Sequence, residues 1–308
     1  MINSIFLLIF GLLLLIAGGE FLVKSAVSFA KKLNVSPLLI GLTVVSFGTS
    51  APELMVSLQA AFDDAAGISI GNIIGSNIAN IGLVLGLTVF IKPIFIEKKK
   101  YIISWIVMIL SSVSLIGLLC DGVISFSDGI MFLTGLALFI FLSLKFIKKE
   151  EFDENKEDEK GIFISIILFL SGAAGLYFGS ELFVSSSVLI AKSIGISEFV
   201  IGVSIVAFGT SLPELVTSIV AAVRKQNSIS IGNLIGSNIF NIFAVLGVTA
   251  IIKPLTLASE SLTFYSLLVM LVFAIVMGIY LFGKKISRLK GLILIAGYII
   301  YIAFSLIS

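Results

Sequence analysis

The chain has 308 residues, of which 58% are hydrophobic and 12% are charged, and its mean hydropathy is +1.21. Soluble domains carry roughly 25% charged residues, so this composition excludes an ordinary water-soluble domain and indicates an integral membrane protein. The absence of histidine excludes imidazole metal ligands and His-based acid–base catalysis, and the single cysteine, Cys120, excludes an intrachain disulfide.

Ten apolar runs are long enough to cross a bilayer, which takes about 20 residues. The first run has no Lys or Arg ahead of it, so we interpret it as a retained helix rather than a signal peptide. The hydrophilic stretch 148–160 predicts a linker between one five-helix domain, 1–147, and another, 161–308. The expected helices span residues 5–30, 38–62, 68–91, 101–120, 125–146, 162–191, 199–223, 228–252, 262–282 and 289–307.

The second half of the chain repeats the first at a constant offset of 161 residues. Between 67–82 and 228–243, 12 of 16 positions are identical, and Lys92-Pro93 also recurs. Because each half has an odd number of helices, the two halves enter the membrane from opposite sides, as in many secondary transporters. The sequence therefore predicts an all-α integral membrane fold of ten helices in two inverted five-helix repeats.

The Lys and Arg residues predict the orientation of the chain in the cell membrane. With ten helices, one side of the membrane receives 18 of these residues and the other side only Lys192 and Lys253. Positively charged loops stay on the cytoplasmic side, so we expect both termini outside and the linker inside. The linker is acidic; a regulatory cation site there is one hypothesis, and we favour a solvated segment.

The motif Gly-Thr-Ser-x-Pro-Glu occurs at 48–53 and 209–214. Proline breaks a helix, so we expect helices two and seven to be discontinuous. Each Glu lies inside a hydrophobic run, where a carboxylate is costly and indicates a functional site. Ser50-x-x-Glu53 also fits a capping box, and in that alternative each Glu only caps a restarted helix. We favour a cation site, because a helix break at membrane depth needs buried partners or a polar cavity.

Oxygen atoms surround the break. Carbonyl groups from Ser46 to Thr49, the hydroxyls of Thr49 and Ser50, and the Glu53 carboxylate would form an all-oxygen cluster. Hard cations such as Na⁺ and Ca²⁺ prefer such ligands. The second half supplies the same roles through Thr210, Ser211, Glu214, Ser237 and Asn241.

A second motif, Gly-Asn-x-x-Gly-Ser-Asn-x-x-Asn, occurs at 71–80 and 232–241. Asn72, Ser76 and Asn80 are spaced four residues apart, so they lie on one helical face, with Asn77 beside them. Buried amides need partners in lipid, and we interpret Asn80 and Asn241 as amide-oxygen ligands near the membrane midplane.

Two further features have less specific interpretations. Gly71-x-x-x-Gly75 and Gly82-x-x-x-Gly86 predict close approach of a neighbouring backbone. Glu20 recurs as Glu181 without flanking hydroxyls or a proline break, and the alternatives are a gating or proton-relay role and a carboxylate paired near a water-filled funnel.

The two long motifs, each present twice, resemble the α-repeats of the cation/Ca²⁺ exchanger superfamily, in particular prokaryotic members of the sodium/calcium exchanger branch. Proton/calcium exchangers usually carry a Gly-Asn-Ala-Ala-Glu motif, whereas this chain has Gly-Asn-Ile-Ile-Gly at 71–75, which favours Na⁺ over H⁺. The resemblance implies antiport of Na⁺ against Ca²⁺ by alternating access, in which helices one and six slide across a core holding four cation positions. The cation ligands it implies are Glu53, Glu214, Thr49, Thr210, Ser50, Ser211, Ser76, Ser237, Asn80, Asn241, Ser46 and Ala207.

Well-studied exchangers often carry Asp at one of the two middle positions. In this chain both positions are Asn, Asn80 and Asn241. Two ionised Glu residues balance one Ca²⁺ or two Na⁺, and a third Na⁺ would leave an unbalanced buried charge. The sequence therefore leaves the stoichiometry open.

Coupling to H⁺ or K⁺ within the same superfamily and, in another class, a cation channel remain alternative functions. A scaffold without transport would leave the two Glu residues unexplained, and no nucleophile–base pair indicates an enzyme. We expect no cofactor and no nucleic-acid partner, and a chain that works as a monomer in a lipid bilayer.

Overall fold

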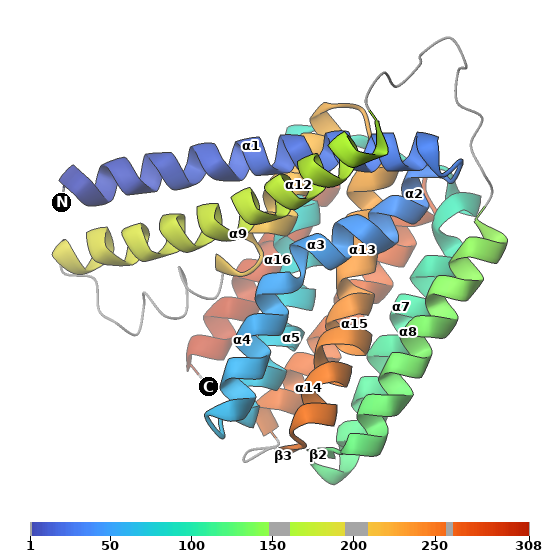
Figure 1. Cartoon of the computed structure of the whole chain (residues 1–308). Coiled ribbons are helices and arrows are strands. Elements are labelled where there is room, and N and C mark those ends of the chain that lie inside the picture. Colours follow the sequence, from blue (N-terminus) through green and yellow to red (C-terminus); the bar gives the residue numbers. More distant parts are fainter. Residues whose placement is uncertain (1, 148–160, 195–208, 257–260, 308) are drawn as a thin grey trace. The chain divides into compact units, whose positions relative to one another are not determined.

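The computed structural model describes residues 2–147, 161–194, 209–256 and 261–307 (Figure 1). The expected linker 148–160 and the first ten residues of the expected helix 199–223 lie outside the described residues. The elements are α1 (Ile2–Lys32), α2 (Pro37–Ile40), η1 (Gly41–Val45), α3 (Ser46–Thr49), α4 (Ala51–Phe62), α5 (Ala66–Ala79), η2 (Asn80–Leu85), α6 (Gly86–Ile91), β1 (Ile94–Phe95), α7 (Lys98–Leu118), η3 (Leu119–Asp121), β2 (Val123–Ile124), α8 (Phe126–Phe146), α9 (Ile162–Ser193), α12 (Leu212–Val223), α13 (Asn227–Phe240), η5 (Asn241–Leu246), α14 (Gly247–Ile252), β3 (Leu255–Thr256), α15 (Ser261–Leu281), β4 (Lys285–Ile286) and α16 (Arg288–Ile307).

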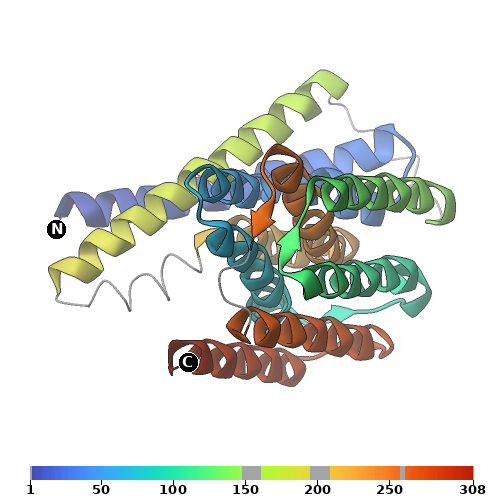
Figure 2. The same ribbon diagram turned by 90° about the horizontal axis from the view of Figure 1, so that it is seen from below.

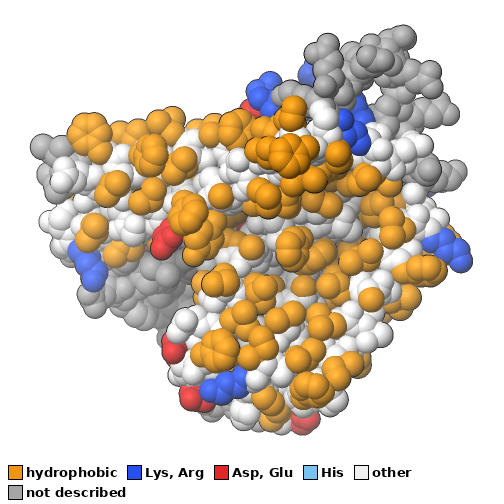
Figure 3. All heavy atoms as spheres, viewed as in Figure 1, with side chains coloured by type: hydrophobic (Ala, Val, Ile, Leu, Met, Phe, Trp, Pro, Cys, Tyr) orange, Lys and Arg blue, Asp and Glu red, His pale blue; other side chains and the backbone are white. Residues whose placement is uncertain are grey.

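The helices are long and apolar enough for a membrane. Within the described ranges, eight helices could cross a bilayer, and a ninth span results if Pro37–Thr49 and Ala51–Phe62 form one bent span. Hydrophobic side chains cover most of the face in Figure 3, with few charges among them. Large apolar side chains such as Phe163, 71% exposed, need lipid around them. The prediction of an all-α membrane fold is confirmed, while the count of ten helices stays a prediction.

The chain forms two compact units, and each draws on both halves of the sequence. Unit 1 comprises Met1–Thr49 and Lys148–Asn233, and unit 2 comprises Ser50–Ile147 and Leu234–Ser308. Both copies of the repeat therefore contribute helices to each unit, and the division falls within the motifs themselves.

In unit 1, α1 and α9 run side by side and their backbones meet at glycines (Figure 1). A Cβ on Gly11, Gly18, Gly172 or Gly179 would lie 2.7–2.8 Å from a backbone nitrogen of the other helix. Gly11 and Gly172 are equivalent positions of the repeat, as are Gly18 and Gly179. The same contact is thus made from both halves, and only a residue without Cβ fits there.

In unit 2, α7 packs on α15, α8 on α14, and α16 on η2 and α6. A Cβ on Gly82 would lie 2.9 Å from Tyr298 Cβ, and one on Gly86 would lie 3.1 Å from the Gly291 carbonyl oxygen. The contact at Gly86 confirms the predicted close approach of a neighbouring backbone, whereas the atoms nearest to the Cβ position of Gly82 belong to side chains. No atom of the described residues lies within 4 Å of the Cβ position of Gly71 or Gly75, so the same prediction finds no support there.

Two pairs of short antiparallel strands close the ends of unit 2. β1 pairs with β4, and β2 pairs with β3, which Figure 2 shows as adjacent green and orange arrows. β1 and β3 are repeat equivalents, because Ile94 and Leu255 are 161 residues apart and each follows a Lys-Pro pair. Equivalent positions of the repeat therefore form equivalent strands. Sequence reasoning did not predict these strands.

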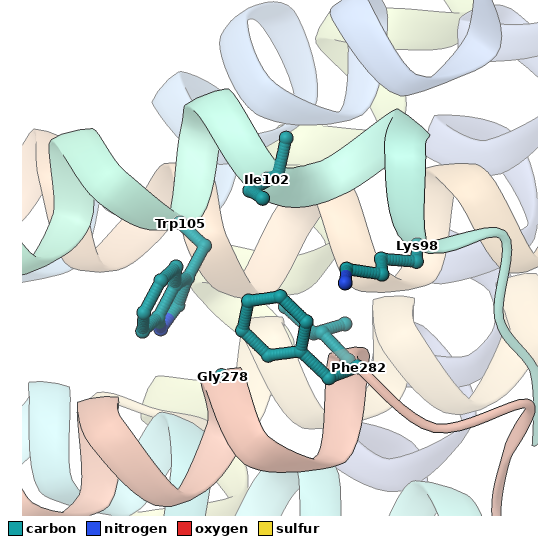
Figure 4. A pocket seen from close by; sticks show the side chains of 6 residues that line it. Lys98, Ile102, Trp105, Gly278 and Phe282 are labelled. Carbon is teal, nitrogen blue, oxygen red and sulfur yellow. The ribbon is translucent and has the colours of Figure 1, made fainter.

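The packing of α7 on α15 depends on Gly278. The Trp105 indole lies against this glycine, donates from Nε1 to the Ala274 carbonyl at 2.9 Å and contacts the Phe282 ring edge-on at 5.7 Å (Figure 4). Lys98 Nζ lies 4.3 Å from the Phe282 ring centroid. These residues line a cavity of about 10 Å³, room for no more than one water molecule.

We expect Gly278→Ala to lower the Tm of the purified protein, because the new Cβ would overlap the Trp105 ring. Overpacking of this kind costs about 1–3 kcal/mol. Adding Trp105→Leu should recover part of the loss by making room. Equal Tm values for the unmodified protein and Gly278→Ala would contradict this account of the contact.

Candidate cation site

Each Gly-Thr-Ser-x-Pro-Glu motif places its Glu in the first turn of a helix. α4 and α12 both have proline at their start, where the missing N–H would have no helical partner anyway. Glu53 and Glu214 follow in the same turn and are 0% exposed. Neither Ser50 nor Ser211 makes a side-chain capping hydrogen bond, so the capping interpretation finds no support. Each motif therefore buries a carboxylate at the start of a helix.

In unit 1, the end of α3 is held against α13 by polar contacts. Thr49 Oγ1 donates to Asn233 Oδ1 at 3.1 Å, and Ser46 Oγ is 3.0 Å from the Asn233 carbonyl oxygen. Ser46 Oγ also donates to the Gly41 carbonyl at 2.8 Å, across the π-helical turn η1. Asn233 in turn donates from Nδ2 to Ser218 Oγ at 3.1 Å. Hydroxyl, amide and carbonyl oxygens are thus concentrated where α3 ends.

Unit 2 contains the equivalent of the contact between Asn233 and Ser218. Asn72 Nδ2 donates to Ser57 Oγ at 3.1 Å and to the Glu53 carbonyl oxygen at 3.3 Å. Ser57 is the repeat equivalent of Ser218, and Asn72 that of Asn233. The first Asn of each motif therefore ties its helix to the helix that carries the Glu. The spacing predicted only that Asn72 shares a helical face with Ser76 and Asn80, and the structure adds these contacts to the helix that carries Glu53.

The last Asn of each motif begins a π-helical segment. Asn80 opens η2 and Asn241 opens η5, and both residues are 0% exposed. Within the described part of the chain, Asn80 Oδ1 and Nδ2 and Asn241 Oδ1 have no hydrogen-bond partner. A buried polar atom without a partner costs free energy, and π-helical turns are frequent at functional sites. Both observations mark these amides as sites for a ligand.

The predicted ligands are divided between the units. Unit 1 contains Ser46, Thr49, Thr210, Ser211 and Glu214, and unit 2 contains Ser50, Glu53, Ser76, Asn80, Ser237 and Asn241. All eleven are buried except Thr210, which is half-buried. The structure joins Ser46 and Thr49 directly, by a contact of 3.3 Å from Thr49 Oγ1 to the Ser46 carbonyl oxygen. Ala207 lies outside the described residues.

The Glu20 carboxylate is paired with two basic side chains. This agrees with the second alternative given for it above, a paired carboxylate. Arg224 donates from Nε and Nη2 to its carboxylate at 2.9–3.0 Å, and Lys24 Nζ lies 3.8 Å from the same group. The three side chains border a cavity of about 390 Å³ that Ser28 and Leu168 also line. Its repeat equivalent Glu181 is exposed.

Sequence reasoning missed three residues that organise the site. Ser57 and Ser218 anchor the first Asn of each motif, and Arg224 pairs with Glu20. The serines could have been found, because they recur at the offset of 161. Arg224 could not have been found in this way, since its repeat equivalent is Asp63 and no sequence pattern links Arg224 to Glu20.

Comparisons with known proteins identify the family of this chain. Residues 3–145 and 164–307 match the model of a family described as sodium/calcium exchanger protein. The putative antiporter CaxA of Alkalimonas amylolytica is 37% identical over 315 residues, with 98% of each chain covered. The sodium/calcium exchanger MaX1 of Methanosarcina acetivorans is 33% identical over 341 residues, with 96% of each covered. A solved structure of the sodium-calcium exchanger NCX_Mj matches with a TM-score of 0.85 and 35% identity, covering 98% of this chain and 99% of that one.

Proposed function

This chain belongs to the sodium/calcium exchanger family, and from that premise we propose that it is a secondary active antiporter exchanging Na⁺ for Ca²⁺ by alternating access. The observation that carries the proposal is the pair of fully buried carboxylates, Glu53 and Glu214, each beside hydroxyl and amide oxygens in a repeated motif. Oxygen-only ligands suit both cations. A buried carboxylate in an apolar setting is favourable when a cation accompanies it.

In this proposal the two carboxylates are shared Ca²⁺ ligands, and the hydroxyl and carbonyl oxygens around them complete the Na⁺ positions. Two ionised carboxylates balance one Ca²⁺ or two Na⁺, so either load leaves a neutral site. The full set consists of Glu53, Glu214, Thr49, Thr210, Ser50, Ser211, Ser76, Ser237, Asn80, Asn241, Ser46 and Ala207.

The proposed moving part is the pair α1 and α9. Their glycine-lined contact gives them backbone-to-backbone packing, which supports movement as one body. We further propose that the chain acts as a monomer in the cell membrane with both termini outside, needs no cofactor and has no enzymatic activity.

The test is ⁴⁵Ca²⁺ uptake into proteoliposomes loaded with Na⁺. We expect uptake that requires internal Na⁺ and stops when internal Na⁺ is replaced by choline. Uptake driven by a pH gradient alone, or only with K⁺ present, would overturn Na⁺ coupling in favour of another ion. Uptake that continues with no counter-ion on the other side would identify a channel instead.

A further inference from the structure

The two middle amides of unit 2 are not equivalent. Asn241 Nδ2 donates to Asn77 Oδ1 at 3.0 Å, whereas Asn80 has no hydrogen-bond partner at either side-chain atom within the described residues. Both side chains are 0% exposed, and Asn77 is 1% exposed. Sequence symmetry alone would make Asn80 and Asn241 alike, so the difference comes from what surrounds them.

The orientation of Asn77 is fixed by acceptors. Its Nδ2 donates to the Asn238 carbonyl oxygen at 3.2 Å and to Met270 Sδ at 3.7 Å. A carbonyl oxygen and a thioether can only accept, so the nitrogen of Asn77 must face them and its oxygen must face the other way. That oxygen accepts a hydrogen bond from the Nδ2 of Asn241 at 3.0 Å. The Asn241 oxygen is thereby directed away from Asn77.

We propose that Asn77 is a positioning residue that holds the Asn241 amide with its oxygen toward the transported cation. This inference deepens the proposed function and rests on it. An amide presents a negative oxygen on one side and a positive NH₂ on the other, so a cation site needs the amide turned one way. The acceptor at Asn77 selects that orientation before the ion arrives, and the Asn241 oxygen stays without a protein partner for the ion to occupy.

The repeat provides a matched control. Asn238 is the equivalent of Asn77, is 2% exposed and donates from Nδ2 to Met108 Sδ at 3.6 Å. Its Oδ1 has no partner in the described part of the chain, so Asn238 does not hold Asn80 as Asn77 holds Asn241. Asn77 and Asn238 thus share their burial and their bond to a methionine, whereas the bonds of Asn77 to Asn241 and to the Asn238 carbonyl oxygen distinguish it from Asn238.

The experiment compares Asn77→Leu with Asn238→Leu in reconstituted exchange. For Asn77→Leu we expect the half-saturating concentrations of Na⁺ and Ca²⁺ to rise about tenfold, the size of one buried hydrogen bond, with a smaller change in maximal rate. For Asn238→Leu we expect the half-saturating concentrations to stay within about twofold of those of the unmodified protein. If Asn77 and Asn238 contributed only to packing, both substitutions would raise the half-saturating concentrations equally. That result would overturn the proposal.

A double-mutant cycle tests the link to Asn241. In an Asn241→Ala background, Asn77→Leu should add no further loss of affinity, because there is no amide left to orient. Additive losses would overturn the positioning role. If Asn77→Leu does not fold, Met270→Leu against Met108→Leu repeats the comparison with volume-conserving changes; a smaller loss confined to Met270→Leu is expected, and equal effects would again count against the proposal.

Equilibrium ⁴⁵Ca²⁺ and Na⁺ binding in detergent separates the two proposals. Absence of exchange by the unmodified protein would contradict antiport alone, and the binding constants of the same variants would still decide the role of Asn77. Absence of binding for both cations would overturn both.

Discussion

We expect replacement of either Glu53 or Glu214 by Gln to lower Na⁺-dependent Ca²⁺ uptake by more than about 100-fold. Glutamine keeps the size of the side chain but removes one of the two negative charges that balance the ion. Leaving a buried charge without its partner costs about 3–5 kcal/mol, and each 1.4 kcal/mol is a factor of ten in affinity. Because both carboxylates are 0% exposed, solvent cannot compensate for the lost charge.

The measurement is initial ⁴⁵Ca²⁺ uptake into Na⁺-loaded proteoliposomes, normalised to reconstituted protein. Glu181→Gln is the matched control, since it makes the same change at an exposed repeated carboxylate, and it should transport at the unmodified rate. Substantial exchange by Glu53→Gln or Glu214→Gln would show that the charge is not needed, and the ligand assignment would have to be abandoned.

The second large effect is expected from Gly18→Leu in α1. Even the Cβ would lie 2.7 Å from the Leu176 nitrogen and 2.8 Å from the Gly172 carbonyl oxygen, closer than non-bonded atoms approach. Backbone atoms cannot rotate away as a side chain does, so α1 and α9 must separate along their contact. We expect near-complete loss of transport together with a lower Tm, and an intermediate effect for Gly18→Ala.

Gly117→Leu is the control for this substitution. Gly117 is exposed on α7, and no atom of the described residues lies within 4 Å of its Cβ position. This variant should keep both its Tm and its transport rate. Normal uptake by Gly18→Leu would show that α1 and α9 tolerate separation, and the proposed movement of the pair as one body would lose its support.

From the sequence we could predict the candidate ligands that occur in both copies of the repeat. Glu53 and Glu214 were recognisable because a carboxylate is rare in an apolar run, and the structure buries both. The hydroxyls and amides around them followed from the same two motifs. The offset of 161 also relates residues that make equivalent contacts, such as the contact of Asn72 with Ser57 and that of Asn233 with Ser218.

What the sequence could not predict depends on contacts between distant residues. The π-helical turns at Asn80 and Asn241 have no local signal, because the surrounding residues fit an ordinary helix equally well. Asn72 was placed on the correct helix, and Ser57 recurs as Ser218, but the contact between Asn72 and Ser57 is visible only once the helices are packed. The glycine contact of α1 with α9 likewise involves positions that look like any small residue in a membrane helix.

The ion pair between Glu20 and Arg224 makes the two halves of the chain energetically unequal. The repeat equivalents of these residues are Glu181 and Asp63, two negative charges that would repel. If transport interconverts two states related by the repeat, only one of them can contain this attraction. A partly exposed pair contributes about 0–1 kcal/mol, enough to bias the populations of the two states up to about fivefold. The chain duplicates its proposed ion ligands but not its charges at the periphery, so a cycle that looks symmetric in sequence need not have equal forward and reverse rates.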